Sequence, residues 1–473
     1  MGQEITQTAF SAQDSERFAL ALREETGLLE AWLAGGHFDD AAYRVGFELE
    51  AWLIDHNCFP LPANEAYLDR LASPLVVPEL SKFNVELNGT PQRLADTAFG
   101  TMERELESTW RRCQDVAHEL EGALIMIGIL PTVRERDLTL ANISPLNRYY
   151  ALNRQVLERR GREPLHIDIR GREQLSLTHA DVMLEAATTS FQVHLQAPAP
   201  DIGRYLNAST VLSGPLVALA ANAPFLFGHD LWDESRIPLF EQAVDSAEGT
   251  RGQARRVTFG ERYLRSGPGE FFADNLSRFA PLLPMHFEDG ARRLSHLRLH
   301  NGTIWRWNRL LIGFEGETPH VRIEQRCMAA GPSVRDMVAN AAVYVGACTT
   351  LARRQPPPED DLPFAHARDN FYRCAREGLA APVRWLDGST RPVAQLLHDE
   401  ILPMARDGLA ALGIDARDSE PYLDVVRSRV RSGQNGASWQ RRHAQRHGRD
   451  LFRLTAEYLE HQRSGMPVHE WPV

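Results

Sequence analysis

Lysine is almost absent from this chain of 473 residues, because Lys82 is the only one and every other cationic side chain is arginine or histidine. A phosphate-binding loop of the Walker A type needs a Gly-Lys-Ser/Thr step, whereas Lys82 stands in Ser-Lys-Phe. Protein-kinase chemistry needs a lysine in a Val-Ala-Ile-Lys context, which is also missing. A pyridoxal-phosphate enzyme would depend on Lys82. If the protein handles phosphate, we expect it to use arginine and metal ions.

Long apolar runs are missing too. No stretch approaches the roughly 18 apolar residues of a membrane span, and the opening Met-Gly-Gln-Glu-Ile-Thr has no apolar core of a signal peptide. The five cysteines are scattered without a Cys-x-x-Cys pair, which favours a reduced protein. The net charge of −11 argues against general nucleic-acid binding. We therefore expect a cytoplasmic protein that binds neither membranes nor nucleic acids.

Three common catalytic motifs are absent as well. The chain has no Gly-x-Gly-x-x-Gly, no Gly-x-Ser-x-Gly and no His-Glu-x-x-His. These absences argue against a Rossmann dinucleotide site, a serine-hydrolase elbow and the metal-binding helix of a zinc protease.

The most informative segment, Arg44 to Asp55, alternates strictly between apolar and polar positions. Gly46, Glu48 and Glu50 share one parity, and five apolar side chains share the other. Successive side chains of a strand point to opposite faces, so this pattern predicts a strand with both glutamates on one face. Two bare carboxylates about 7 Å apart repel by roughly 2 kcal/mol at an effective dielectric of about 20. On this segment alone, a half-buried strand with a solvated polar face is the simpler interpretation.

Three later segments, residues 83–88, 191–196 and 321–326, repeat the alternation. One antiparallel sheet with helices on its apolar face would gather their polar groups in a single cleft, so the sequence predicts an α+β fold. Carboxylate oxygens favour Mg²⁺ or Mn²⁺, and Mn²⁺ also tolerates histidine. The polar positions of the three segments are Asn84, Glu86 and Asn88; Gln192, His194 and Gln196; and Arg322, Glu324 and Arg326.

The chain has its clearest internal boundary at an acidic proline run, residues 356–361. We expect a catalytic core over residues 1–355 and a mostly helical extension over residues 356–473, packed on the same domain. Ser11 and Asp14 resemble a capping box, so a helix should follow through about residue 33. Further helices are predicted over residues 94–121, 204–222 and 336–354 and from Asn147, and further strands over residues 123–130, 165–170 and 305–308.

Residues 427–449 carry seven arginines and two histidines. A solvated helical face is the simpler interpretation of this segment. The alternative is a positive lid over an anionic ligand, in which the glycines of residues 433–437 would supply backbone freedom.

Five motifs together resemble one known family. Gly46-Phe-Glu-Leu-Glu50 resembles the Gly-x-Glu-x-Glu strand of the glutamate–cysteine ligase family, in the branch that holds plant and proteobacterial enzymes and bacterial carboxylate–amine ligases. Four more segments fit that family in order, and the set spans about residues 40–350. They are Phe83 to Asn88; Gln192-Val-His194; Ala221-Asn-Ala-Pro-Phe225 with the downstream Arg236; and Ile323-Glu-Gln-Arg326 with Gly331-Pro332 and Asp336 after it.

The resemblance implies a fold like the catalytic domain of glutamine synthetase, which guanido kinases share, with a curved antiparallel sheet that holds metals and ATP. It implies ATP-dependent amide formation through a γ-glutamyl phosphate, with Mg²⁺ or Mn²⁺ as the metal. Carried over by position, the metal ligands are Glu48, Glu50, Glu86, Glu324 and His194. The catalytic arginines are Arg326 and Arg236, and the groups that bind substrate or ATP are Asn88, Gln192, Arg148, Arg322 and Asn222.

The chain departs from the family pattern in two places, one of which is Leu195-Gln196, where the family has a small apolar pair. Gln192 stands where the family has a histidine, so it keeps hydrogen bonding but loses a metal ligand. This departure bears on the identity of the substrate more than on ATP chemistry.

The leading prediction is an ATP-dependent carboxylate–amine ligase that acts on small molecules, with a glutamate–cysteine ligase favoured. The amine acceptor and a homodimeric state are left open. The alternatives are a phosphoryl transferase to a nitrogen acceptor, a metal-dependent hydrolase, and a non-catalytic binding or regulatory protein on the same fold.

Overall fold

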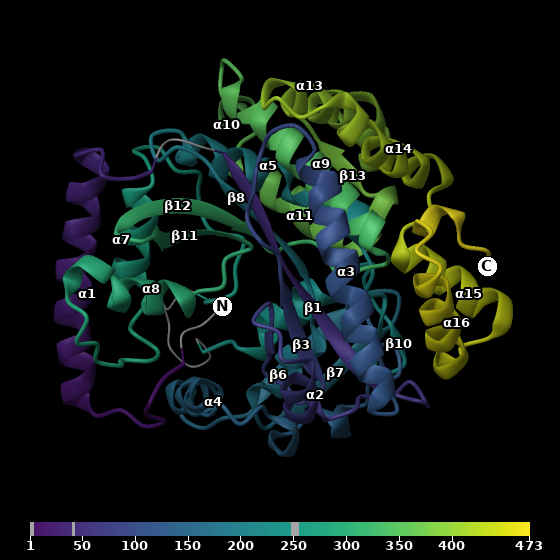
Figure 1. Cartoon of the computed structure of the whole chain (residues 1–473), viewed down its shortest axis with the longest axis horizontal. Coiled ribbons are helices and arrows are strands. Elements are labelled where there is room, and N and C mark those ends of the chain that lie inside the picture. Colours follow the sequence, from purple (N-terminus) through teal and green to yellow (C-terminus); the bar gives the residue numbers. More distant parts are fainter. Residues whose placement is uncertain (1–3, 40–42, 247–254) are drawn as a thin grey trace.

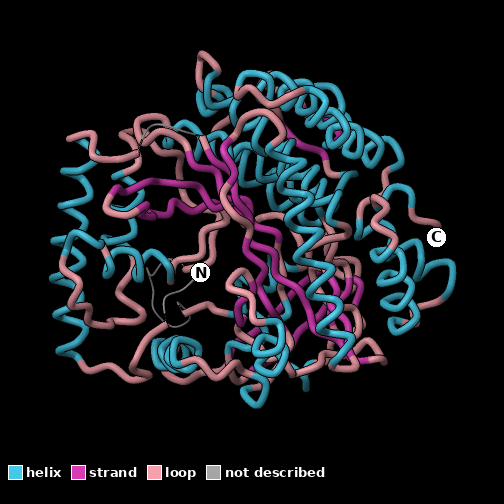
Figure 2. Tube along the Cα trace, in the orientation of Figure 1, coloured by secondary structure: helices cyan, strands magenta, loops and turns pink. Residues whose placement is uncertain are grey.

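A curved eight-stranded antiparallel sheet runs through the centre of the molecule, which a computed structural model describes over residues 4–39, 43–246 and 255–473 (Figures 1 and 2). Its strand order is β11-β12-β8-β1-β3-β2, and β4 and β5 also pair with β1. The predicted α+β fold is confirmed. The strands are β1 (Arg44–Asp55), β2 (Val76–Pro78), β3 (Asn84–Asn88), β4 (Gln92–Arg93), β5 (Gly122–Ile125), β8 (Phe191–Gln196), β11 (Asn308–Glu315) and β12 (Thr318–Gln325).

The long strand β1 aligns the polar positions of its neighbours. Glu48 lies opposite Asn88 of β3 on one side and Gln192 of β8 on the other, and Glu50 lies opposite Glu86. On the far side of β8, His194 of that strand lies opposite Glu324 of β12. Since paired residues of neighbouring strands point to the same face, the register places the predicted site residues on one face of the sheet.

Helices cover the apolar side of the sheet. α5 (Ile202–Ala220) lies against β11 and β12, and α9 (Val334–Arg353) lies against β8. Phe47, Val193 and Ile323 are buried there, which fixes the opposite direction for the polar side chains between them. Although α5 is buried along nearly its whole length, no helix in the described ranges is both long and apolar enough to cross a membrane.

Two helices begin at serine caps. Ser11 before α1 (Ala12–Ala34) forms the predicted capping box, because its Oγ accepts from the Asp14 backbone N–H at 3.2 Å and its own backbone N–H donates to Asp14 Oδ2 at 2.8 Å. Ser333 caps α9 in a similar way, accepting from the Asp336 backbone N–H at 3.1 Å. The caps fix the starting residue of both helices.

The part of the chain beyond residue 356 is mostly helical, as predicted, and lies on one side of the sheet (Figure 1). It contains one small hairpin, β13 (Pro382–Arg384) with β14 (Thr390–Pro392). α13 packs on α9, and α11 packs on α5, so the extension rests on the two central helices. Its helices are α10 (Pro358–Asp361), α11 (Phe364–Glu377), α12 (Val393–Leu396), α13 (Leu402–Ala411), α14 (Ala416–Ser432), α15 (Gly436–His447) and α16 (Leu451–Arg463).

The remaining elements lie around the sheet, and one of them, α3, packs on α9 and β5. β6 and β7 form a separate hairpin, so the predicted strand over residues 165–170 does not join the main sheet. These elements are α2 (Asn64–Leu71), α3 (Ala98–Glu119), α4 (Asn147–Arg159), α6 (Arg236–Ala243), α7 (Gly269–Arg278), α8 (Ser295–Gly302), β6 (Leu165–Arg170), β7 (Gln174–His179), β9 (Phe225–Leu226) and β10 (His229–Asp230).

Two predicted strands have different bounds. The apolar run over residues 123–130 is a strand only as far as Ile125. Beyond it, Met126 donates its N–H to Gln462 Oε1 at 3.0 Å and accepts from Tyr458 at 2.9 Å, so α16 takes the bonds that a neighbouring strand would make. The strand expected over residues 305–308 begins only at its last residue and runs on to Glu315.

Candidate active site

The polar face of the sheet borders a cavity of about 230 Å³. Its wall combines carboxylates, arginines and apolar side chains such as Phe240 and Trp305, so it suits a ligand with both charged and apolar parts. The structure brings these predicted site residues to the wall: Glu48, Glu50, Glu86, Arg148, Gln192, Arg322 and Arg326.

Glu50, Glu79 and Glu86 form an acidic group on this wall, with ligand oxygens that lie within 4.8 Å of one another. Glu79 lies directly after β2, and Glu86 lies on the neighbouring strand β3. Glu50 is held from the other side, because Oε2 accepts from the Ser190 backbone N–H at 2.6 Å and Oε1 from Gln192 Nε2 at 2.9 Å. The three carboxylates are thus fixed close together.

The acidic group resists ionisation. Burial raises the pKa of Glu50 to about 7, and the charge of Glu86 adds to this rise. Burial likewise raises the pKa of Glu79 to about 7 and that of nearby Glu185 to about 8, and it raises the pKa of Glu86 well above its usual range. A divalent cation would relieve the cost of these crowded negative charges, and oxygen-only ligands suit Mg²⁺ or Mn²⁺. The acidic group therefore fits such a cation.

Glu324, in contrast, lies among arginines. Arg309 donates from Nε to Oε2 at 2.8 Å and from Nη2 to Oε1 at 2.9 Å, and Arg326 donates from Nη1 to Oε2 at 3.0 Å. Burial opposes ionisation, but these two charges hold the pKa of Glu324 below its usual range. Arg326 Nη1 also donates to Gln192 Oε1 at 2.7 Å. Since both of its oxygens are engaged, Glu324 orients the arginines here instead of offering an open metal ligand.

Glu48, His194 and Glu324 form a second candidate metal group, with ligand atoms within 4.8 Å of one another. Arg322 donates from Nε to His194 Nδ1 at 3.0 Å. Because Nδ1 accepts, the proton of the neutral ring lies on Nε2, which is 3.3 Å from Glu48 Oε1. A metal at Nε2 would need the proton to move to Nδ1 and the Arg322 bond to break. This second group therefore fits a metal less well than the acidic group does.

Two predicted substrate-binding residues flank the acidic group. Asn88 donates from Nδ2 to Glu86 Oε1 at 3.0 Å, so it positions that carboxylate without lining the cavity itself. Arg148 lines the cavity, donates to the Tyr149 hydroxyl at 2.7 Å, and has its guanidinium carbon 4.6 Å from the centre of that ring. Arg148 thus offers a positive charge on the same wall as the carboxylates.

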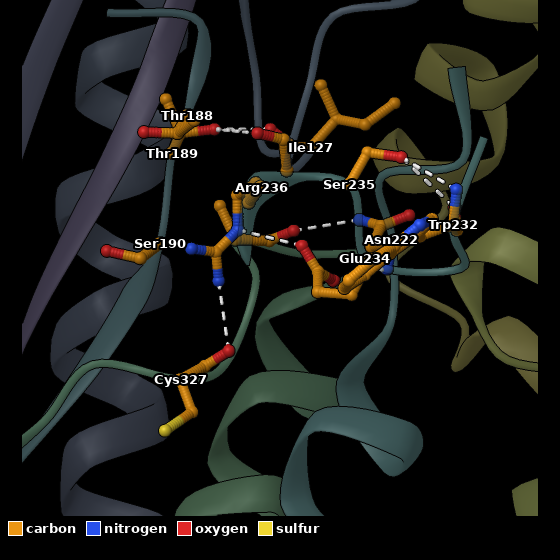
Figure 3. A network of polar contacts seen from close by, with 12 residues as sticks. Ile127, Thr188, Thr189, Ser190, Asn222, Trp232, Glu234, Ser235, Arg236 and Cys327 are labelled. Carbon is orange, nitrogen blue, oxygen red and sulfur yellow. Dashed lines mark hydrogen bonds and ion pairs between the residues drawn. The ribbon is translucent and has the colours of Figure 1, made fainter. Parts of the chain in front are cut away.

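Arg236 lies apart from the cavity wall. Its Nε is 3.0 Å from Glu234 Oε1, and its Nη2 donates to the Cys327 backbone oxygen at 3.1 Å. Figure 3 shows the buried guanidinium turned toward these two partners, close to Ser190. Its charge still favours ionisation of Glu50. The geometry gives no support to direct phosphate contact, and the catalytic role of Arg236 stays a prediction.

Asn222 is engaged by the protein itself. Its Nδ2 donates to the Ala330 backbone oxygen and to the Tyr458 hydroxyl, both at 2.8 Å, and its Oδ1 accepts from Gln440 at 2.9 Å. Its backbone N–H donates to Glu234 Oε2 at 3.0 Å, a contact drawn in Figure 3. Asn222 does not line the cavity, so these contacts describe a residue that joins the C-terminal helices to the body of the fold.

Three site residues were missed by the sequence analysis. Glu79 follows the short strand β2 directly and has the parity of its polar face, but β2 is too short to show a pattern. Glu185 lies in a 3-10 helix, residues 182–187, where no alternation exists. Arg309 lies opposite Glu324, in a strand that was expected to end one residue earlier. Only Arg309 could have been found, from a correct boundary for β11.

The arginine-rich segment is neither a lid nor a solvated face throughout. Asn435, within residues 433–437, donates to the Ala218 backbone oxygen at 2.9 Å and is buried. Arg429 forms a buried ion pair with Asp336 at 2.7 Å. No residue of the segment lines the cavity. The lid interpretation is therefore wrong, because packing against the central helices occupies the segment that would have to move.

A family model described as glutamate–cysteine ligase family 2 matches residues 44–457, which is most of the chain. The chain belongs to this family. The resemblance carried by the five motifs is thereby confirmed, and membership places the chain among ligases of the glutamate–cysteine ligase type. A search of curated protein sequences gave no match.

Two solved structures of low sequence identity match this chain over most of its length. A glutamate–cysteine ligase from Francisella tularensis, in complex with AMP, has a TM-score of 0.53 at 12% identity, with 90% of each chain covered. A bifunctional glutathione synthetase from Pasteurella multocida has a TM-score of 0.48 at 12% identity, with 92% of this chain and 55% of that chain covered. The first likeness shows that this chain has the fold of a glutamate–cysteine ligase.

Proposed function

We propose that this protein is an ATP-dependent carboxylate–amine ligase that forms a γ-glutamyl amide through an acyl phosphate, with release of ADP and phosphate. One observation carries the proposal. A single cavity wall sets the acidic group Glu50, Glu79 and Glu86 beside the arginines Arg322 and Arg326. A cation site next to an anion site is what a bound nucleotide triphosphate and a carboxylate substrate need.

The acidic group would hold Mg²⁺ or Mn²⁺, for which its buried oxygen ligands fit. When bound, the ion supplies positive charge against the phosphates. Arg326 lies between the acidic group and the arginine-bound Glu324. It donates hydrogen bonds to Gln192 and Glu324, and its charge favours ionisation of Glu50. A guanidinium in that place can contact a phosphoryl group as its charge develops. In a chain with one lysine, arginine has to supply this contact.

The described part of the wall lacks the side chains that most often act as covalent nucleophiles, and the hydroxyl of Thr303, which does line it, donates to the His300 backbone oxygen at 2.8 Å. Among the described residues that line the cavity there is no cysteine, serine, lysine or histidine. Cys327, beside Arg326 in the sequence, turns its Sγ toward the Trp307 backbone oxygen at 3.7 Å, and burial raises the pKa of its thiol to about 12. Activation of the carboxylate by a protein nucleophile is therefore disfavoured, and activation by phosphate takes its place.

The chemistry balances in two steps. A carboxylate oxygen of the first substrate attacks the γ-phosphorus, and ADP leaves. The amine nitrogen of the second substrate then attacks the acyl carbon, loses a proton, and displaces inorganic phosphate, so that an amide remains. In the first step, where negative oxygens approach one another, Arg326 would neutralise charge, and a cation held by the acidic group would add to this effect.

Glutamate and cysteine are the first substrates to test. Membership of the family supports this pair, and the Francisella tularensis ligase, crystallised with AMP, supports a nucleotide as the third ligand. Gln192 bridges Arg326 and Glu50 in the place where the family has a histidine. Because Gln192 lies between Glu50 of the acidic group and Arg326, a change at this position could alter which amine is accepted, so amines other than cysteine should also be tested.

Product analysis tests the proposal directly. The full chain is incubated with ATP, Mg²⁺, glutamate and a panel of amino acids and amines, and nucleotides and amides are quantified together. We expect ADP, phosphate and a γ-glutamyl amide in equal amounts. Glu86→Gln is the inactive control, and the exposed Glu460→Gln is its matched control. AMP as the product, or ADP release without an amide, would overturn the proposed reaction.

A further inference from the structure

A third cluster of side chains that could hold a metal lies outside the cavity wall, between α15 and α16 at the C-terminal end of the molecule (Figure 1). His443 and His447 are one helical turn apart on α15, and Glu457 comes from α16. One ring nitrogen of each histidine and one oxygen of Glu457 lie within 4.8 Å of one another. Side chains four apart share one helix face, so both imidazoles turn toward α16.

The ligand directions are fixed by neighbours. The two oxygens of Glu457 have different partners. Oε2 lies 2.9 Å from His443 Nε2, and Oε1 accepts from Arg453 Nε at 2.7 Å. The His443 side chain is 1% exposed, and its ring centre lies 5.3 Å from that of Trp439. Outer contacts such as that of Arg453 orient ligands before a metal binds, and an ion here would take the place between Glu457 Oε2 and His443 Nε2.

We propose that His443, His447 and Glu457 bind a divalent transition-metal ion, with Zn²⁺ the best match, and that the ion joins α15 to α16. Two imidazoles and one carboxylate are the ligand types of zinc sites with three protein ligands, in which water takes the fourth position. His447 and Glu457 are only half-buried, so water and the ion can reach the cluster. Nitrogen ligands separate this cluster from the oxygen-only acidic group, which suits Mg²⁺ or Mn²⁺.

A metal-free ion pair is the simpler alternative, because the His443–Glu457 contact needs no metal. That alternative does not explain why a ring nitrogen of His447 lies within 4.8 Å of the other two ligand atoms. Among the described residues His447 has no hydrogen-bond partner, although its ring centre lies 4.9 Å from that of His443. A role as the third metal ligand explains the position of His447.

The site has a structural consequence. Tyr458, next to Glu457, donates to the Met126 backbone oxygen at 2.9 Å and accepts from Asn222 at 2.8 Å. An ion between α15 and α16 would hold α16 in the position where it makes these contacts. Because a ligand that binds only the folded chain stabilises it, Zn²⁺ should raise the melting temperature.

Zinc titration of the full chain tests the proposal. The protein is stripped with a chelator, saturated with Mg²⁺ to fill the acidic group, and titrated with Zn²⁺ alone. We expect about one tightly bound Zn²⁺ per chain, and an affinity more than about 100-fold weaker in His447→Gln, since even outer contacts cost 10–100-fold. His461→Gln is the matched control, because His461 also packs on Trp439 but lies outside the cluster. Equal affinity in wild type and His447→Gln would refute the site.

Two further measurements separate the outcomes. Co²⁺ in place of Zn²⁺ should give the absorption bands of a four-coordinate ion in the wild type and in Glu86→Gln, but not in Glu457→Gln. Bands that vanish in Glu86→Gln would place the ion in the cavity and overturn the proposal. Zn²⁺ should raise the melting temperature of the wild type and leave that of His447→Gln unchanged, with circular dichroism confirming that each variant is folded.

Discussion

Arg309 holds both carboxylate oxygens of Glu324 at once, at 2.8 and 2.9 Å, with the two side chains almost completely buried. The pair faces the cavity side of β11 and β12, where the two residues lie directly opposite each other. This contact decides how the polar face is divided. It engages both oxygens of Glu324, and it leaves the acidic group Glu50, Glu79 and Glu86 as the place where we propose that cations bind.

Loss of Arg309 should destabilise the fold. Arg309→Met leaves Glu324 with only part of its compensation, and breaking a buried pair costs about 3 kcal/mol or more. We expect the free energy of unfolding, from urea denaturation, to fall by that amount. Arg293→Met removes an exposed pair with Glu317 at 2.8 Å and should cost less than about 1 kcal/mol. Similar decreases in the free energy of unfolding for Arg309→Met and Arg293→Met would contradict the expectation that the buried pair contributes more to stability than the exposed pair.

Metal binding should depend on the acidic group. Mn²⁺ with ATP is expected to raise the melting temperature of the wild type, because it binds the folded chain. Glu79→Gln combined with Glu86→Gln removes two of three oxygen ligands and should abolish the shift. The fold should persist, because neutral amides relieve the repulsion among these carboxylates. An unchanged melting-temperature shift in the double variant would contradict this assignment and indicate that the cation binds at Glu48 and His194 instead.

Arg326→Lys should lower turnover more than binding. Lysine keeps the charge but cannot bond to Gln192 and Glu324 while presenting a planar fork. Removing one group that stabilises developing charge typically costs about 100-fold or more in kcat. We therefore expect kcat to fall by about that factor while KM for ATP changes little, measured by steady-state ADP release. Wild-type kcat in a folded Arg326→Lys variant would rule out this role.

The sequence predicted the parts of the site that follow strand periodicity. Glu48, Glu50, Glu86 and Glu324 all lie on polar positions of alternating segments, and they share one face because β1 and β8 lie in the middle of the sheet. Alternation cannot show which strands are neighbours. It therefore could not predict that Glu50 and Glu86 lie together in an acidic group while Glu324 lies among arginines. Glu185, in a 3-10 helix, was beyond it for a related reason, since such a segment has no two-residue period.

Motif matching leaves the roles of two residues as predictions. Asn222 and Arg236 belong to a segment that matches the family in order, yet neither lines the cavity. Their polar atoms are taken up by Glu234, Tyr458 and a backbone oxygen. A motif shows that a residue type is required at a position, but it does not distinguish a ligand contact from a buried hydrogen bond. The division of the chain near residue 356 likewise stays a prediction.

Stability should fall as the pH rises through neutrality because of Glu241. Burial raises its pKa to about 7 from about 4.5 in the unfolded chain, although Trp307 and Tyr372 both donate to its Oε1. The folded chain then binds more protons than the unfolded chain between these pH values, so the free energy of unfolding falls as the pH rises. Glu241→Gln should lessen this fall between pH 5 and pH 8 in urea denaturation. Parallel pH profiles for the two proteins would contradict the assignment.

The origin of the oxygen in the released phosphate tests the acyl-phosphate route. In that route a carboxylate oxygen of glutamate attacks the γ-phosphorus and stays with phosphorus when the amine displaces it. Glutamate labelled with ¹⁸O in its side-chain carboxylate should therefore transfer one label to inorganic phosphate for each amide formed, as read by mass spectrometry. Labelled water with unlabelled glutamate should give unlabelled phosphate. Label in water-derived phosphate would point to hydrolysis of ATP, and label in AMP would point to an adenylate, so either result would exclude the proposed intermediate. Because Arg326 and a cation held by Glu50 and Glu86 would neutralise a transferring phosphoryl group, and because the described wall has no cysteine, serine, lysine or histidine to accept it, we expect the label in phosphate.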